Sequence, residues 1–397
     1  MANVTLAQRL IIRHSNFAFR TLSMEYAQTI AMARDLLADG RAGDVKQMIE
    51  PLLEPLSGTD DAPSQVMLHT LMARIHVAHG DAIQRALDAL EPLESASARA
   101  QLPDRVRAEV MLWLGWAHAR RDSTLDEEAR ALTLLDEADR LFESELDAPG
   151  RCWAHLGRAH AYFAIDEYQL MRESLAEAHP HLRSIDDIRA SCWMHELQIA
   201  GCRFEGRYAE AQEHIDALAD AAQTHGDRAM KGRAAAYQAA LHLDLGRSPD
   251  TIIETAERAR HLLRATDAAA RYPYLAAYHA HTQALILRGD WSEADALIDH
   301  ALDTVGDHAT ARAHLLTLRA RLALRRNELD DAQSITEALF DRARQLPHGL
   351  QRSHVALLHG ELLHRRGDFE AAQGWMKRAH RNARETGHRG NQLQAVL

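Results

Sequence analysis

The sequence is poor in cysteine, in long apolar runs and in lysine, and each shortage narrows what the chain can be. Three cysteines in 397 residues, none in a C-x-x-C pair, cannot form a disulfide framework and fit a reducing compartment. No run of 18 apolar residues occurs, so the sequence predicts no membrane-spanning helix. The apolar cluster nearest the start lies between Arg9 and Arg13 and is too short for a signal-peptide core. We therefore expect a cytoplasmic protein.

Motifs of catalysis and of cofactor binding are also missing. The sequence contains no glycine-rich phosphate loop, no nucleophile elbow and no H-E-x-x-H pair. Nothing singles out a nucleophile, so we expect neither an enzyme nor a cofactor. Cys152 and His155 recur as Cys192 and His195, a spacing that makes a zinc site conceivable. Because the intervening tryptophans are core positions, we interpret these cysteines as packed side chains and predict no metal site.

The charge balance argues against nucleic acid as a partner. The net charge is −11, whereas affinity for duplexes depends on neutralising phosphates. Only three lysines accompany many arginines, a bias typical of a GC-rich bacterial genome. Histidine is abundant, with 25 copies, and moving from pH 7 to pH 6 would add roughly ten positive charges. We interpret most of these histidines as surface residues.

A repeat of about 40 residues runs through the chain. Trp113, Trp153 and Trp193 are spaced 40 residues apart. Glycine, asparagine or aspartate recurs at a similar interval, at Gly40, Gly80, Asp122, Asp166, Gly206, Gly246, Gly289, Asn327 and Gly367. These residue types favour the left-handed conformation in which many helices end. Each is therefore predicted to end the first helix of a pair, which we call helix A.

The segments that follow four of these turn residues are alike. They share an apolar residue, a carboxylate and a small alanine, in Gly206-Arg-Tyr-Ala-Glu-Ala, Gly289-Asp-Trp-Ser-Glu-Ala, Asn327-Glu-Leu-Asp-Asp-Ala and Gly367-Asp-Phe-Glu-Ala-Ala. A carboxylate in the first turn of a helix is favoured by the helix dipole. The alanine lets the second helix, helix B, approach helix A. The pattern predicts a repeated helix hairpin.

These residues resemble the tetratricopeptide repeat family. Trp153, Leu156, Gly157 and His160 match the family's A-helix pattern, with histidine in the tyrosine place. The alanine of helix B is matched by Ala211, Ala294, Ala332 and Ala372, with Ile215, Ile298 and Met376 in the phenylalanine place. The longer period and the missing proline are more similar to the MalT-like helical-repeat region of bacterial regulators. The resemblance covers roughly residues 20–390.

The fold class follows from the repeat and the resemblance together. We predict an all-α, right-handed superhelical solenoid of about nine antiparallel helix hairpins, since a repeat array grows by stacking and needs no single core. Residues 1–19 are predicted to form an N-terminal capping helix and residues 20–386 the repeat array. Residues 387–397 are predicted to be a partial repeat or a C-terminal cap.

The resemblance implies that the A helices line a concave face where partners bind. Counting from the Trp place, the inward positions are predicted to be Arg151, Arg158, Tyr162, Gln198, Lys231, Gln238, His242, His279, Gln283, His314, Arg321, His354, Glu361 and His364. Arginine, histidine and glutamine on this face would steer an acidic or amide-rich partner towards it. The alternative is that solvated helix faces simply carry charges. Only Lys231 supplies a lysine here, which argues against a chaperone-tail clamp.

Two functional hypotheses remain open. The first is a non-enzymatic scaffold that binds a protein or peptide on its concave face, in a bacterial regulatory or assembly role. The second is a ligand- or peptide-sensing region of a MalT-like transcriptional regulator. The first predicts a protein or peptide partner, and the second a small molecule or a peptide. We expect neither direct nucleic-acid binding nor a membrane. Homo-oligomerisation stays open.

Overall fold

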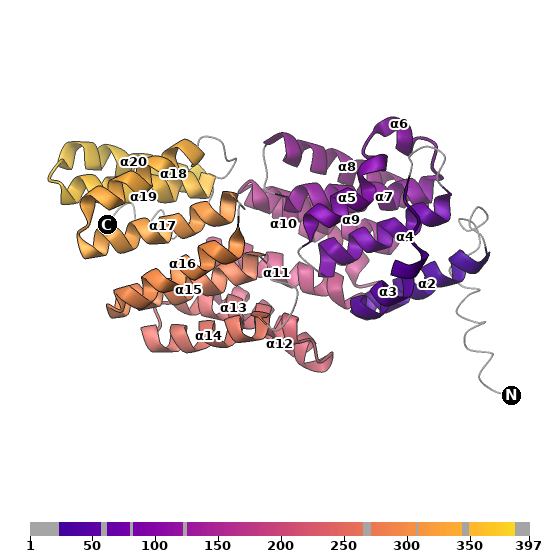
Figure 1. The fold of residues 1–397 in the computed structure, drawn as a ribbon, viewed down its shortest axis with the longest axis horizontal. Helices are drawn as coiled ribbons and strands as arrows, with labels where there is room; N and C mark the ends of the chain where they lie inside the picture. Colours follow the sequence, from indigo (N-terminus) through magenta and orange to yellow (C-terminus); the bar gives the residue numbers. More distant parts are fainter. Residues whose placement is uncertain are drawn as a thin grey trace.

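The computed structural model describes residues 24–56, 62–79, 82–121, 125–264, 271–306, 309–343 and 349–385. Within these ranges every regular element is helical, which confirms the all-α prediction (Figure 1). The predicted caps, at residues 1–19 and 387–397, lie outside the described residues. Among the described helices, none combines the length and the apolarity needed to span a bilayer.

Nine antiparallel helix pairs account for most of the described chain, and each pair consists of an A helix followed by a B helix. In chain order the pairs are α2 (Met24–Ala38) with α3 (Ala42–Ile49), α4 (Pro63–Arg74) with α5 (Ile83–Leu90), α7 (Asp104–Arg120) with α8 (Leu125–Ser144), α9 (Ala148–Ala164) with α10 (Tyr168–Leu182), α11 (Ile188–Phe204) with α12 (Tyr208–Thr224), α13 (Arg228–Asp244) with α14 (Pro249–Arg264), α15 (Arg271–Arg288) with α16 (Trp291–Val305), α17 (Ala309–Arg326) with α18 (Leu329–Ala343), and α19 (Gly349–Arg365) with α20 (Phe369–Glu385).

Short helical segments fill the first connections, at η2 (Glu50–Leu52), η3 (Ile75–His79), η4 (Glu91–Leu93) and α6 (Ala96–Arg99). Successive pairs stack in sequence order along the molecule (Figure 1).

The turns between A and B helices adopt the conformation that the turn residues predict. Asp166 and Asn327 have φ values of 63° and 62°, in the left-handed region that few residue types tolerate. Glycine occupies the same place, also with positive φ, at Gly40, Gly206, Gly246, Gly289 and Gly367. Seven of the nine predicted turns are thus confirmed, while Gly80 and Asp122 lie outside the described residues.

The repeated tryptophans form the centre of the N-terminal core. Trp113, Trp153 and Trp193 are 1%, 2% and 5% exposed, as a core position requires. The rings of Trp113 and Trp153 lie 5.2 Å apart, and Trp116 contacts Trp193 at 5.1 Å. The Arg74 guanidinium of α4 lies 5.5 Å and 5.4 Å from the rings of Trp113 and Trp153. Stacking and cation–π attraction therefore reinforce the apolar burial.

Helix α4 and the segment η3 also bind α11, although more than a hundred residues separate them. Arg74 Nη2 donates to Asp187 Oδ2 at 3.0 Å, and Arg189 Nε donates to the Ala78 carbonyl at 2.6 Å. Trp153 Nε1 donates to the same Asp187 oxygen at 2.9 Å. The second pair thus meets the fifth.

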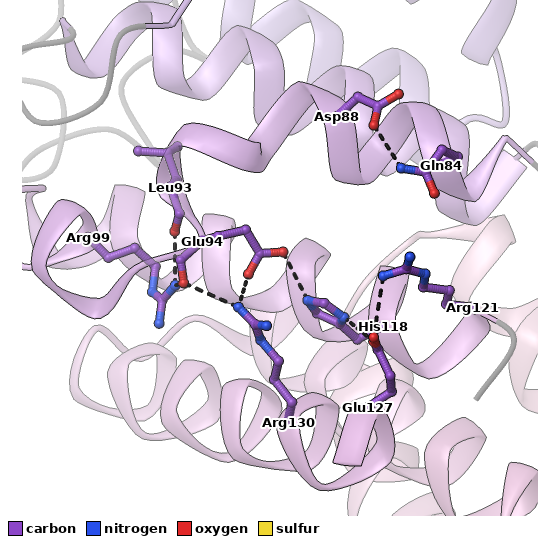
Figure 2. A network of polar contacts seen from close by, with 9 residues as sticks. All are labelled: Gln84, Asp88, Leu93, Glu94, Arg99, His118, Arg121, Glu127 and Arg130. Atoms are coloured by element: carbon purple, nitrogen blue, oxygen red, sulfur yellow. Dashed lines mark hydrogen bonds and ion pairs between the residues drawn. The ribbon is translucent and has the colours of Figure 1, made fainter. Parts of the chain in front are cut away.

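A polar network fastens the loop after α5 to the next pair, as Figure 2 shows. His118 of α7 is 2% exposed, and its two ring nitrogens lie 3.0 Å from Glu94 Oε1 and 2.6 Å from Glu127 Oε2. Arg130 of α8 also pairs with Glu94. Burial raises the pKa of Glu94, but His118 and Arg130 outweigh it and hold that pKa below its usual value. Helices α7 and α8 are thereby both joined to the preceding pair, α4 with α5.

Removal of His118 should destabilise the protein, because Glu94 and Glu127 would lose their shared partner. We expect His118→Ala to lower the free energy of unfolding by about 3 kcal/mol. Arg121→Ala removes an exposed partner of the same Glu127 and should cost less than about 1 kcal/mol. Urea unfolding followed by circular dichroism measures both. Equal effects of the two variants would show that the buried network adds no stability.

Close helix packing depends on Gly157 of α9. A Cβ atom there would lie 2.7 Å from Leu135 Cδ2 and 2.8 Å from Trp116 Nε1. Trp116 is itself held by a hydrogen bond of 2.8 Å from its Nε1 to the Trp153 carbonyl. Neither neighbour can move without disturbing the tryptophan core, so this position admits no side chain.

We expect Gly157→Ala to lower the free energy of unfolding by about 1–3 kcal/mol through overpacking. Gly43→Ala in α3 is the matched control, because its Cβ would meet nothing within 4 Å. That change should raise stability by about 0.5–1 kcal/mol, since alanine favours a helix interior. A thermal unfolding scan distinguishes the two. A Gly157→Ala variant as stable as the parent would refute the tight approach.

Candidate functional site

Each A helix has an outer face towards the B helices and an inner face turned away from them. Helix α17 shows the division clearly. Arg319 pairs with Asp295 and Asp299 of α16, so it lies on the outer face. Arg321 follows two residues later, about 200° further round the helix. It therefore lies on the inner face.

A cavity of about 400 Å³ opens on the inner faces of α15, α17 and α19. It is lined by Gln283, Ile286, Leu287, Arg321, Arg325, Leu357, Leu358, Glu361 and, from α20, Met376. Leu357, Leu358 and Ile286 are buried, whereas Gln283, Arg321 and Glu361 are half-buried. Apolar side chains thus surround a few polar groups, the usual composition of a binding site of this size.

The polar groups of this cavity differ in how far their bonding capacity is satisfied. Glu361 accepts from Arg365 of the same helix at 3.1 Å. The Gln283 amide nitrogen is buried and has no hydrogen-bond partner. Burial lowers the pKa of Arg321, an effect that Glu361 opposes and Arg325 reinforces. An acceptor that entered the cavity would meet an amide donor and a guanidinium together.

A histidine pair lies on the same inner face. His279 Nδ1 of α15 is 2.9 Å from His314 Nε2 of α17, and the two rings are 4.8 Å apart. Burial lowers the pKa of His314 to about 4, and Arg321 acts in the same direction. The pKa of His279 is also held well below its usual value, first by burial and then by His314 and Arg321. Both rings are therefore neutral at pH 7.

Six of the predicted site residues meet on this face. Gln283, Arg321 and Glu361 line the cavity. His279 pairs with His314, and the charge of His354 on α19 acts on His279. From here on, the inner groove means these six residues: His279, Gln283, His314, Arg321, His354 and Glu361. Their role in binding stays a prediction.

The predicted residues of repeats 4 to 6 do not join the inner groove, and their expected position on the concave face is corrected. Arg151 pairs with Asp139 and Glu143 of α8. Arg158 pairs with Asp136 of α8 and Glu177 of α10. These arginines therefore lie on the outer face of α9.

The other predicted residues of repeats 4 to 6 also lie on the outer faces of their helices. Gln238 exchanges hydrogen bonds with Gln212 of α12, and His242 contacts Thr255 of α14 at 3.4 Å. Tyr162, Gln198 and Lys231 are half-buried on the same outer faces, in register with His242, Gln238 and Arg151. The ring of His364 meets the ring of Phe369 edge to face at the turn into α20, with 5.2 Å between their centres. None of these six residues lines the cavity.

The error has a physical cause. The Trp place itself lies on the inner face, so Arg151 and Arg158, two residues before and five after Trp153, lie on the opposite side of the helix. The turn residues give the correct register. Trp153 precedes Asp166 by thirteen residues, and His314 and His354 precede Asn327 and Gly367 by the same number. Aligning the repeats on their turns would have placed both histidines beside the tryptophans.

A second cavity, of about 790 Å³, lies against α2, α4, α7, α9 and the segment before α11. Its charged side chains are largely bound to one another. Arg34 pairs with Glu109 at 3.0 Å, Arg105 pairs with Asp147, and Arg74 pairs with Asp187. These ion pairs engage all three arginines of the lining and belong to the N-terminal core.

The conceivable zinc site finds no support in the geometry. Cys152 is buried, and the Cys192 thiol donates to Met230 Sδ at 3.1 Å. Burial raises the pKa of both thiols to about 12, so neither is a thiolate at pH 7. Within the described ranges, no group of three or more histidine, cysteine or acidic side chains could hold a metal ion.

Solved structures resemble this arrangement, although no protein-family model and no curated protein matches the chain. A Rap protein complexed with competence and sporulation factor has a TM-score of 0.67 at 13% identity, covering 92% of this chain and 99% of that one. NprR in complex with its cognate peptide NprX has a TM-score of 0.59 at 15% identity, covering 79% and 88%.

A third neighbour is the Rap conjugation gene regulator of plasmid pLS20 in complex with the Phr* peptide. Its TM-score is 0.59 at 13% identity, covering 91% of this chain and 96% of that one. The chain has a tetratricopeptide-like helical-repeat fold. At such low identity the likeness establishes the fold alone, and the narrower resemblance to MalT-like regions stays a prediction.

Buried histidines should make this helical-repeat array sensitive to acid. Burial is the main cause that lowers the pKa of His160 to about 3 and those of His195, His281 and His314 to about 4. Below pH 6.5 the unfolded chain binds protons that the folded chain does not. Each such histidine then lowers the free energy of unfolding by about 1.4 kcal/mol per pH unit.

We expect the urea midpoint to fall steeply from pH 6.5 to pH 5, with circular dichroism as the readout. His195→Gln should flatten this dependence, because glutamine does not titrate. A midpoint that stays constant over the same range would contradict the burial of these rings.

Proposed function

We propose that this protein is a non-enzymatic scaffold that binds a peptide in its inner groove and serves a bacterial regulatory role. The observation that carries the proposal is the cavity on α15, α17 and α19, where half-buried polar groups from three successive pairs surround buried leucines. Two of the structural neighbours were solved with peptides, which supports a peptide as the partner.

The chemistry of the groove favours an acidic partner. Arg321 and Arg325 outnumber Glu361, whose carboxylate is already engaged by Arg365. An extended peptide also offers backbone carbonyls, which the Gln283 amide could satisfy. Leu357 and Leu358 provide apolar surface against which apolar side chains of the peptide could pack. The whole chain is acidic, so this local excess of basic groups would select the site at which an acidic peptide docks.

The alternative is a sensing region of a MalT-like regulator, and one observation favours it. A ligand in the groove would bridge α15, α17 and α19, whose pairs contact mainly their immediate neighbours. Bridging three pairs would fix the angles between them, and an effector domain could respond to that change. This hypothesis requires such a domain, whereas a scaffold does not.

A peptide selection tests the proposed site. We expect the immobilised full chain to enrich defined sequences from a synthetic hexapeptide pool, and Arg321→Ala to abolish that enrichment. Arg319→Ala is the matched control, since it removes the same charge from the outer face of the same helix. It should enrich the same sequences as the parent, as read by mass spectrometry. Identical selections by parent and Arg321→Ala would place binding elsewhere, and no enrichment by the parent would reject peptide binding.

A further inference from the structure

The inner groove brings two neutral imidazoles and a guanidinium together where a ligand would lie. We propose that His279, His314 and Arg321 form a carboxylate subsite that takes up one proton when an acidic group of the ligand binds. This inference rests on the proposed function, because it assigns the chemistry of the same groove. It adds a specific anion site and a link between binding and pH.

The geometry of the histidine pair allows it to take up one additional proton. With 2.9 Å between His279 Nδ1 and His314 Nε2, one ring donates to the other, and the pair shares one proton along this contact. An added proton occupies the other ring nitrogen of the donating histidine, because the contact nitrogens already share one. The contact is kept, and the charged ring gains a second N–H donor for an acceptor in the groove. A carboxylate is the acceptor that gains most from a charged donor.

The surroundings of the pair explain why it is uncharged without a ligand. The ionisable groups that act most strongly on His279 are all basic: His314 and Arg321 of α17, His354 of α19 and Arg203 of α11. The nearby carboxylates are already engaged. Asp244 accepts from Arg203 at 2.7 Å, and Glu361 accepts from Arg365 at 3.1 Å. An added proton is therefore repelled until an anion arrives.

Gln283 gives an independent indication that an acceptor belongs at this place. It lies one turn after His279 on α15 and lines the same cavity as Arg321. Its amide nitrogen is buried without a partner, a condition that costs about 1–3 kcal/mol unless an acceptor satisfies it. A carboxylate has two oxygens and can accept from the amide and the guanidinium together.

Linkage fixes the sign of the pH dependence. A bound carboxylate offsets the repulsion by Arg321 and raises the pKa of the pair. Binding then consumes a proton between the pKa of the free pair and that of the occupied pair. Over that range affinity should increase as pH falls, by up to tenfold per pH unit for one proton. Above it affinity should be independent of pH.

Nuclear magnetic resonance of histidine rings in the full chain tests the subsite with defined probes. The probes are acetyl-glutamate amide and acetyl-glutamine amide, which differ only in the charge of the side chain. His279→Gln and His314→Asn assign the two resonances. We expect the glutamate probe to raise the pKa of the pair towards 6.5 and the glutamine probe to leave it unchanged.

Two arginine variants separate the subsite from general charge effects. Without any probe, Arg321→Gln should raise the pKa of His314, because a neighbouring cation is lost, and it should remove the response to the glutamate probe. Arg319→Gln should change neither the pKa of His314 nor the response to the glutamate probe. Equal titration curves for both variants, or equal responses to the two probes, would overturn the proposal.

The outcomes also distinguish this proposal from the proposed function. Peptides enriched without regard to acidic residues, by a protein whose histidines ignore the glutamate probe, would retain the peptide groove and reject the subsite. A histidine response to the probe in a protein that enriches no peptide would retain the anion site and reject peptide binding.

Discussion

The structure depends on how the inner faces of the A helices are covered. In the N-terminal half they are covered by protein: α4 lays Arg74 over the tryptophan rings, and Asp187 holds both Arg74 and Trp153. A guanidinium that is 9% exposed would be costly without this carboxylate. The aromatic faces and Asp187 together compensate for its burial. This contact joins the second and fifth pairs, and the arginines of the cavity beside it are already paired with carboxylates.

One position of the repeat differs between the N-terminal half, where protein covers the inner faces, and the C-terminal half, where the inner faces form the groove. Counted from the turn residue, the inner position is Trp153 and Trp193 in the N-terminal half, Arg233 in the next pair, and His314 and His354 near the C-terminal end. Arg233 is 3% exposed and bound to Glu196 at 2.7 Å, so it still belongs to the core. The histidines are only half-buried. The same backbone position therefore packs in one half and presents polar groups in the other.

Sequence reasoning predicted the pairs and the turns because both are local. A left-handed turn at Asp166 or Asn327 and an amphipathic helix on either side are specified within one repeat. The choice of inner face is not local. An indole packs equally well between helices of one pair or against a distant helix, and only the contact between Arg74 and Asp187 decides. A shift of two residues, as from Arg319 to Arg321, reverses the face of a helix. Hence the sequence pattern alone does not decide which face of α9 Arg158 occupies; its pairs with Asp136 and Glu177 do.

The histidines of the array link the stability of the fold to the binding of a ligand, because both depend on whether the rings are protonated. We interpreted most histidines as surface residues, yet several lie in pairs within the array, such as His195 with His214 at 3.2 Å and His279 with His314. Outer pairs face B helices, so a proton added there can only weaken packing. The inner pair faces a groove, where a ligand can supply the compensating charge. The position of a histidine on its helix therefore decides the effect of protonating it. On the outer face protonation destabilises the fold, and on the inner face it allows the ring to bind an anion.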